Sequence, residues 1–174
     1  LNSSLAINDD YLTLAKPASE KLDHISVEHE LNRVINMMLP FCNMNNINIT
    51  KEFSEGTIIG NTQHFHQCFL NLIKNGIEAM PCGGDLIISA SVSNNKVIIR
   101  IQDSGIGMSQ EQINRFGEPY FSTKTKGTGL GTMVAVKIIE TMRGSLKIRS
   151  IVNKGTTLTI TFPKYNNEST LHNK

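Results

Sequence analysis

Two asparagines one helical turn apart are the first residues whose spacing suits a chemical role. Asn71 and Asn75 lie in the segment FHQCFLNLIKNGIEAM, whose apolar residues recur at helical spacing on another face. Residues i and i+4 of a helix share a face, so both amide oxygens would point to one region. Neutral oxygens suit a Mg²⁺ ion that phosphates already partly neutralise. Taken alone, the segment still favours the alternative interpretation, a solvated polar face.

A second candidate is an aspartate that directly follows the strand-like segment VIIRIQ. Asp103 precedes Gly105 and Gly107, and such glycines let a backbone pass close to a flat ligand. One carboxylate oxygen could accept the exocyclic N–H of adenine and would reject guanine, which has an acceptor at that position. Aspartate also initiates tight turns, so a plain turn is the alternative.

The third candidate is the glycine-rich segment KGTGLG, residues 126–131, which opens a helix-like stretch. Repeated glycines leave backbone N–H groups able to point at an anion, and a helix N-terminus adds a favourable dipole. The segment is no Walker loop, because no Gly-Lys-Ser/Thr follows, and no dinucleotide fingerprint, because a loop precedes it. It predicts a phosphate cradle, with a flexible hinge as the alternative.

Hydrophobic periodicity predicts the elements that must position these residues. Helices are expected at 27–44, 61–80, 109–115 and 130–142, the last one ending at Gly144. Strands are expected at 47–53, 85–93, 96–102, 145–151 and 156–162, with a hairpin turn at Asn94-Asn95. Residues 118–128 lack periodicity and are expected to form a mobile loop. This order predicts an α+β fold in which helices cover one face of a sheet.

Composition narrows the classes of protein. The chain has 174 residues, 39% of them hydrophobic, and a net charge of +2, which allows one domain with a small appendage. The sequence contains no block of lysines and arginines of the kind that would predict nucleic-acid binding. No apolar run could span a bilayer and no signal peptide is evident. We therefore expect a cytoplasmic domain cut from a longer protein, and that longer protein could be either membrane-anchored or not. Cys42, Cys68 and Cys82 form no CxxC pair and fit buried thiols in a reducing compartment.

The order of these segments resembles a known family. NLIKNGIEAM, DSGIGM, RFGEPYFSTK, KGTGLG and GTTLTITFP are similar to the asparagine box, first glycine box, phenylalanine box, second glycine box and closing strand of the gyrase, Hsp90, histidine kinase and MutL ATPase superfamily. Within it, the sensor histidine kinases are most similar, and among them the sporulation-type kinases. LTLAKP, residues 12–17, resembles the end of the dimerisation hairpin that precedes such domains.

The resemblance implies a two-layer α/β sandwich with a mixed, mostly antiparallel sheet, helices on one face and a mobile ATP lid. Residues 1–17 would end the dimerisation hairpin, 18–163 would form the catalytic ATP-binding domain, and 164–174 would be a polar C-terminal tail.

The resemblance also implies the roles of individual residues, with ATP and Mg²⁺ bound. Asn75 would bind the metal beside Asn71, and Lys124 would join them as a catalytic residue. Asp103 would read adenine with support from Thr156 through water. The remaining nucleotide contacts would be Lys74, Gly105, Gly107, Met108, Phe116, Phe121, Thr123, Lys126, Gly127, Thr128, Gly129, Leu130 and Gly131.

Several details of the family pattern bear on these roles. Phe116 and Phe121 would anchor the lid, and either Lys124 or Lys126 would reach the terminal phosphate. Many members carry Lys or Arg where this chain has Glu78, so Lys74 or Lys124 would have to substitute for that phosphate contact.

Asn71 separates subfamilies. Gyrase- and Hsp90-type members carry a glutamate there that activates water, and a neutral amide cannot act as a general base. The resemblance therefore implies transfer of the γ-phosphoryl group to a histidine on the dimerisation hairpin, and onward to a response-regulator aspartate. This chain would be monomeric and the full-length protein a homodimer. An ATP-binding regulatory module without activity is the alternative. A hydrolase or a serine-directed kinase is a third possibility, opposed by Asn71 and LTLAKP respectively.

The histidines carry no predicted role. His29-Glu30-Leu31 mimics the phospho-acceptor box, but Asn32-Arg33-Val34 breaks the expected continuation with a basic residue and then a proline, and the segment follows LAKP instead of preceding it. No metal-ligand spacing is present, and all are expected on the surface: His24, His29, His64, His66 and His172.

Overall fold

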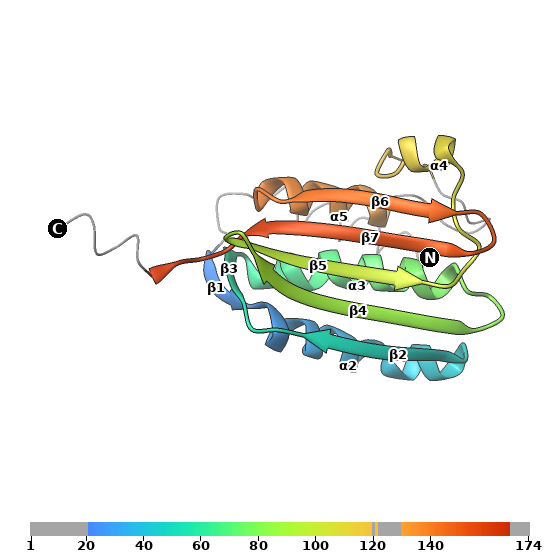
Figure 1. The fold of residues 1–174 in the computed structure, drawn as a ribbon, viewed down its shortest axis with the longest axis horizontal. Coiled ribbons are helices and arrows are strands. Elements are labelled where there is room, and N and C mark those ends of the chain that lie inside the picture. The colour runs from blue at the N-terminus through green and yellow to red at the C-terminus, as the bar shows by residue number, and fades with distance from the viewer. Residues whose placement is uncertain (1–20, 120, 122–129, 168–174) are drawn as a thin grey trace, which may run out of the picture.

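A computed structural model describes residues 21–119, 121 and 130–167, and its ribbon is shown in Figure 1. The helices are α2 (Val27–Met44), α3 (Thr62–Glu78), α4 (Gln110–Asn114) and α5 (Leu130–Thr141). The strands are β1 (Asp23–Ser26), β2 (Ile47–Phe53), β3 (Thr57–Gly60), β4 (Gly84–Ser93), β5 (Lys96–Asp103), β6 (Ser145–Ile151) and β7 (Gly155–Pro163). The expected hairpin end at residues 1–17 lies outside the described part of the chain.

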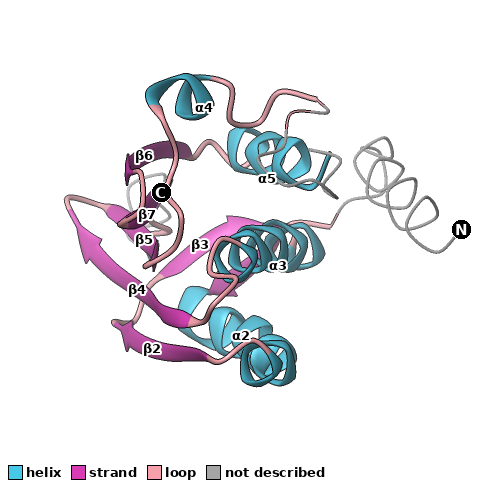
Figure 2. Cartoon of the chain, turned by 90° about the vertical axis from the view of Figure 1, so that its right-hand side faces the viewer, coloured by secondary structure: helices cyan, strands magenta, loops and turns pink. Residues whose placement is uncertain are grey.

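Within the described ranges, five strands form the main sheet in the order β2-β4-β5-β7-β6. β2 pairs with β4 in parallel and the other neighbours are antiparallel. Figure 1 shows α2, α3 and α5 behind this sheet, and Figure 2, turned by 90°, shows strands on one side and these helices on the other. The predicted two-layer α/β sandwich with a mixed, mostly antiparallel sheet is confirmed.

The core lies between the sheet and the helices. Along β5, Val97, Ile99, Ile101 and Asp103 alternate with more exposed residues, because successive strand side chains point to opposite faces. The alternation therefore places Asp103 on the same, helix-covered face as the apolar core. β5 is also the middle strand of the five, so its last residue has a neighbouring strand on each side.

Helix α3 buries a broad apolar face against the sheet, formed by Phe65, Phe69, Leu72 and Ile73. Asn61 caps its N-terminus, with the side-chain oxygen accepting the backbone N–H of His64 at 2.9 Å. The same register that buries these residues turns the asparagines of the helix away from the sheet, towards α5.

Local signals predicted several turns and caps correctly. Asn94 and Asn95 both have positive φ, 52° and 60°, in the hairpin turn between β4 and β5. Ser109 caps α4, and the side chain of Gln112 accepts the N–H of Ser109 at 2.9 Å, completing the predicted capping box.

The two-stranded sheet of β1 and β3 was missed. These strands have four residues each and pair antiparallel at one end of the molecule. Such short segments show too little alternation to be recognised in a sequence. Of the expected C-terminal tail, residues 164–167 are described, and there Tyr165 stacks on His24 with ring centroids 4.4 Å apart.

The predicted end of α5 was partly wrong. The left-handed residue after the helix is Arg143, with φ 61°, and not Gly144. The N–H of Gly144 instead bonds to the carbonyl of Ile139 at 2.8 Å. A Cβ at Gly144 would lie 2.7 Å from the ring of Phe162, so this position requires glycine for close packing.

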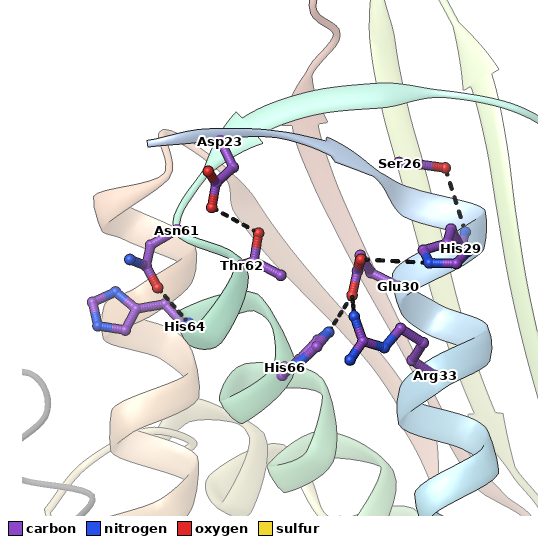
Figure 3. Close-up of polar contacts among 9 residues, drawn as sticks. All are labelled: Asp23, Ser26, His29, Glu30, Arg33, Asn61, Thr62, His64 and His66. Atoms are coloured by element: carbon purple, nitrogen blue, oxygen red, sulfur yellow. Dashed lines mark hydrogen bonds and ion pairs between the residues drawn. The ribbon is translucent and has the colours of Figure 1, made fainter. Parts of the chain in front are cut away.

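The prediction that every histidine lies on the surface was wrong for two of them (Figure 3). His64 is only 6% exposed, and His66 contacts the carboxylate of Glu30 on α2. The two residues point to different sides of α3 (Figure 3), and at both of them helix packing overrides the polarity of the residue type. His29 is 70% exposed in its side chain, and His24 is also exposed, as predicted. His172 lies outside the described residues.

The cysteines divide into two environments. Cys42 and Cys68 are buried, as expected, and burial raises the pKa of both thiols, whereas Cys82 is exposed. In the part of the chain that the structure describes, no helix is long and apolar enough to cross a membrane.

Candidate functional site

The site begins with Asp103, the last residue of the central strand β5. Asp103 is only 8% exposed, and the backbone N–H of Gly105 donates to its Oδ1 at 2.9 Å. Burial raises the pKa of this carboxyl, and hydrogen bonds from the backbone N–H groups of Gly105 and Thr156 oppose that shift. A partly desolvated carboxylate in a strand end is a strong acceptor for a ligand N–H.

Thr156 lies directly beside Asp103. The two residues occupy paired positions on β7 and β5, and Thr156 is 7% exposed. Gly155 makes this approach possible: it has φ +131°, and a Cβ there would lie 2.1 Å from the Asp103 carbonyl oxygen. The predicted neighbours Asp103 and Thr156 are therefore brought together by the strand register.

The loop after Asp103 is held between two other segments. A Cβ at Gly105 would lie 2.2 Å from the carbonyl oxygen of Ala79, and one at Gly107, where φ is +70°, would lie 2.2 Å from that of Ile151. The N–H of Ile106 also donates to the Ala79 carbonyl at 2.9 Å. Both glycines are thus required by contacts within the protein, whatever a ligand adds.

The two asparagines of α3 face the first turn of α5. Asn71 Nδ2 donates to the carbonyl of Gly131 at 3.1 Å, and Asn75 Nδ2 donates to the hydroxyl of Thr132 at 2.9 Å. The interpretation of a merely solvated polar face is therefore wrong for these two side chains. Both bonds use the amide nitrogens, and the amide oxygen is the atom of an asparagine side chain that can bind a cation.

Gly76 joins the two halves of the site. A Cβ at Gly76 would lie 3.8 Å from Oδ2 of Asp103 and 3.2 Å from Leu86 Cδ1. The turn of α3 that carries Asn75 therefore packs closely on the end of β5 that carries Asp103. In the described ranges, no group of three or more His, Cys, Asp and Glu side chains is arranged to hold a metal ion.

Comparison with known proteins decides the family. The family model of histidine kinase-, DNA gyrase B- and HSP90-like ATPases matches residues 60–166, a stretch that includes all the site residues above. The chain belongs to this ATPase family. The resemblance inferred from the motifs is confirmed.

The relatives of this ATPase domain include sporulation kinases. Sporulation kinase C of Bacillus subtilis (strain 168) is 38% identical over 161 residues, covering 88% of this chain and 37% of that protein. The chain thus spans well under half the length of that curated relative. Sporulation kinase B of the same organism is 34% identical, with 94% of this chain and 39% of that protein covered. The predicted likeness to sporulation-type kinases is confirmed.

Solved structures agree on the fold. The catalytic domain of the histidine kinase ThkA is 25% identical, with a TM-score of 0.75 over 83% of this chain and 96% of that one. Full-length ShkA, solved in complex with AMPPNP, has a TM-score of 0.82 at 22% identity, over 94% of this chain and 36% of that one.

Part of the expected lid region of this ATPase domain is described. Phe116 is half-buried against the core, and Gly117, with φ +89°, packs on Val136. The Arg115 guanidinium lies 4.2 Å from the centroid of the Phe121 ring. These contacts fix the segment beside α5. The other expected contacts lie outside the described residues: Thr123, Lys124, Lys126, Gly127, Thr128 and Gly129.

Three further residues predicted to contact the nucleotide differ in their exposure and contacts. Lys74 is exposed on α3, one position before Asn75, and Leu130 begins α5 next to Gly131. Met108 is half-buried, and its N–H donates to the Ser150 hydroxyl at 2.7 Å.

Sequence reasoning missed three residues of the site: Gly76, Thr132 and Ser150. Gly76 and Thr132 stood beside recognised motifs, the first within the asparagine helix and the second directly after KGTGLG. Ser150 had a weaker signal, because only the register of the β6–β7 hairpin places it opposite Thr156.

Proposed function

We propose that this chain is the ATP-binding catalytic domain of a two-component sensor histidine kinase. It would transfer the γ-phosphoryl group of ATP to a histidine on a dimerisation hairpin, for relay to an aspartate of a response regulator. The observation that carries the proposal is the placement of a buried carboxylate, Asp103, beside the helix turn that holds Asn75, with Gly76 between them. One ligand can therefore meet an acceptor for its base and amides for its phosphates.

The donor and acceptor types fit ATP with Mg²⁺. Asp103 would accept the exocyclic amine of adenine, because its carboxylate is buried and already oriented by the Gly105 N–H. Asn75 would bind the metal and Asn71 would lie beside the phosphates, with Gly131 leaving room at the start of α5. Mg²⁺ would supply charge neutralisation between phosphate oxygens.

The transfer needs little covalent chemistry from the protein. An imidazole nitrogen of the acceptor histidine would attack the γ-phosphorus as the bond to the bridging oxygen breaks. ADP would leave with the electron pair, and the imidazole proton would pass to solvent. Positioning supplies most of the rate in such reactions. Asn71 cannot deprotonate water, so hydrolysis would be slow.

The partners and location follow from this reaction. The chain would meet its own dimerisation hairpin and a response regulator on the cytoplasmic side, where ATP is present. Alone it would be monomeric, and the full-length protein would be a homodimer. Analytical sedimentation of the chain and of the full-length protein would check both states.

A radiolabel transfer assay tests the function. The chain is mixed with γ-labelled ATP, Mg²⁺ and the separately produced dimerisation hairpin of the parent protein. We expect acid-labile, base-stable label on the hairpin. Nucleotide binding without transfer would instead support a regulatory module, and phosphate release by the chain alone would support a hydrolase. A chain that does not bind ATP in calorimetry would contradict the whole proposal.

A further inference from the structure

Ser150 is a residue outside the predicted site that contacts three parts of it. It lies on β6, opposite Thr156 on β7. Its Oγ accepts the N–H of Met108 at 2.7 Å, donates to the carbonyl of Gly155 at 3.0 Å, and lies 2.7 Å from Oγ1 of Thr156. The hydroxyl therefore ties the loop after β5 to the β6–β7 hairpin.

The number of hydroxyl protons decides which way these bonds run. Ser150 has one proton, and its bond to the Gly155 carbonyl uses it. The short contact between the two hydroxyls must then use the proton of Thr156. If Ser150 instead donated its proton to Thr156, the Gly155 carbonyl would lose the hydrogen bond that it accepts from Ser150. With its own proton committed to Ser150, Thr156 Oγ1 can offer only lone pairs to anything else nearby.

Thr156 and Asp103 then present the same kind of group. They are paired neighbours on β7 and β5, both are less than a tenth exposed, and a carboxylate at neutral pH is also acceptor-only. Two adjacent acceptors match an amino group whose two N–H bonds reach them directly. They oppose a carbonyl oxygen, because acceptor would face acceptor with no shared proton.

We propose that Ser150 is a specificity-determining positioning residue: it holds the Thr156 hydroxyl as an acceptor beside Asp103, so that the site selects 6-aminopurine over 6-oxopurine nucleotides. This inference rests on the proposed function, since it assumes that Asp103 faces the base. Without the Ser150 hydroxyl, Thr156 can rotate and donate to a carbonyl at the 6-position. Selectivity would then fall even though Asp103 is intact.

The test compares ADP with IDP, whose bases differ by amine against carbonyl at the 6-position and by the proton that the 6-oxopurine carries at N1. Calorimetry gives both dissociation constants for the chain and for Ser150→Ala. We expect the ratio of the IDP to the ADP constant to fall roughly 3- to 10-fold in the variant, the range for one neutral hydrogen bond. Ser150→Thr keeps a hydroxyl and should restore the ratio. Ser145→Ala, at the exposed far end of the same strand, should leave the ratio unchanged.

Each outcome has a definite meaning. Equal weakening of ADP and IDP in Ser150→Ala would show a purely structural role and overturn the inference. If that variant does not fold, Thr156→Val gives the same measurement, and an unchanged ratio there overturns it as well. Failure of the proposed function itself looks different: Asp103→Asn would then leave ADP affinity unchanged, whatever Ser150 does.

Discussion

The side-chain amide of Asn75 on α3 donates a 2.9 Å hydrogen bond to the hydroxyl of Thr132 in the first turn of α5. One turn earlier on α3, Asn71 makes a matching bond to the Gly131 carbonyl. The residues proposed to meet metal and phosphates therefore also join two helices. Binding of metal and phosphates by these residues would therefore directly affect the start of α5.

Replacing Asn75 should separate metal binding from folding. Asn75→Ala removes the proposed ligand oxygen, so affinity for ATP with Mg²⁺ should fall by about 1–3 kcal/mol. The free energy of unfolding should fall by only about 1 kcal/mol, for the lost bond to Thr132. Titrations with Mg²⁺ and with a chelator measure the first effect, and urea unfolding the second. Asn36→Ala, an exposed asparagine of α2, is the matched control. Retained Mg²⁺ dependence would move the metal ligand elsewhere.

Asp103→Asn should weaken nucleotide binding. The amide can still accept the Gly105 N–H, but it loses the charge that strengthens a bond to the base, a loss of about 1–3 kcal/mol. Calorimetry with ADP measures this change. An affinity equal to that of the parent chain would show that Asp103 does not face the base.

The same substitution should stabilise the empty domain at neutral pH. Burial raises the pKa of the Asp103 carboxyl, so the folded state binds its proton more readily than the unfolded state does. This group's contribution to stability is therefore present at low pH and is lost as pH rises from the ordinary aspartate range through the raised pKa. At pH 7, Asp103→Asn should gain about 1 kcal/mol in the free energy of unfolding. Urea unfolding should show this gain shrinking as the solution is acidified. A gain that grows on acidification would contradict the argument.

Two glycines should respond in opposite ways to alanine. At Gly105 a Cβ would lie 2.2 Å from the Ala79 carbonyl oxygen, so Gly105→Ala should cost about 1–3 kcal/mol of stability. At Gly131 the nearest atom, in the Asn71 side chain, would be 3.6 Å away, so Gly131→Ala should keep or raise stability by about 0.5–1 kcal/mol. Thermal unfolding compares the two variants.

Gly131→Ala also tests the phosphate end of the site. If phosphates approach the backbone there, the added methyl should weaken ATP binding although the domain is at least as stable as before. Full affinity in calorimetry would place the phosphates away from Gly131.

The contact between Glu30 and His66 should stabilise the packing of α2 on α3 (Figure 3). The two side chains are only 12% and 20% exposed, so His66→Ala should lower the free energy of unfolding by about 1–3 kcal/mol. His29, which is 70% exposed and 4.0 Å from the same carboxylate, is the control, and His29→Ala should cost less than about 0.5 kcal/mol. A double-mutant cycle with Glu30→Gln isolates the pair. Additive effects of the two substitutions would show that it contributes nothing.

Long periodic segments and local signals made most of the fold predictable. The helix at Val27–Met44 and the strand at Ile47–Phe53 have the bounds that periodicity indicates, because each buries one face of a regular pattern. β1 and β3 were missed because each has only four residues and forms a sheet only by pairing with the other. His64 and His66 were misplaced because a polar type says little about a residue's orientation on a helix.

The amino-acid sequence by itself determined the family and the element order, and it predicted Asp103, Asn71 and Asn75 as site residues, because these depend on residue types at fixed spacing along one chain. Only the tertiary structure placed Asp103 beside Thr156, Gly76 against Asp103, and the asparagines on Gly131 and Thr132. Those contacts join residues distant in sequence, and strand register and helix packing decide which of them meet. The role of Ser150 belongs to the same class, since its hydroxyl has a defined direction only when Met108 on one segment and Gly155 and Thr156 on another surround it.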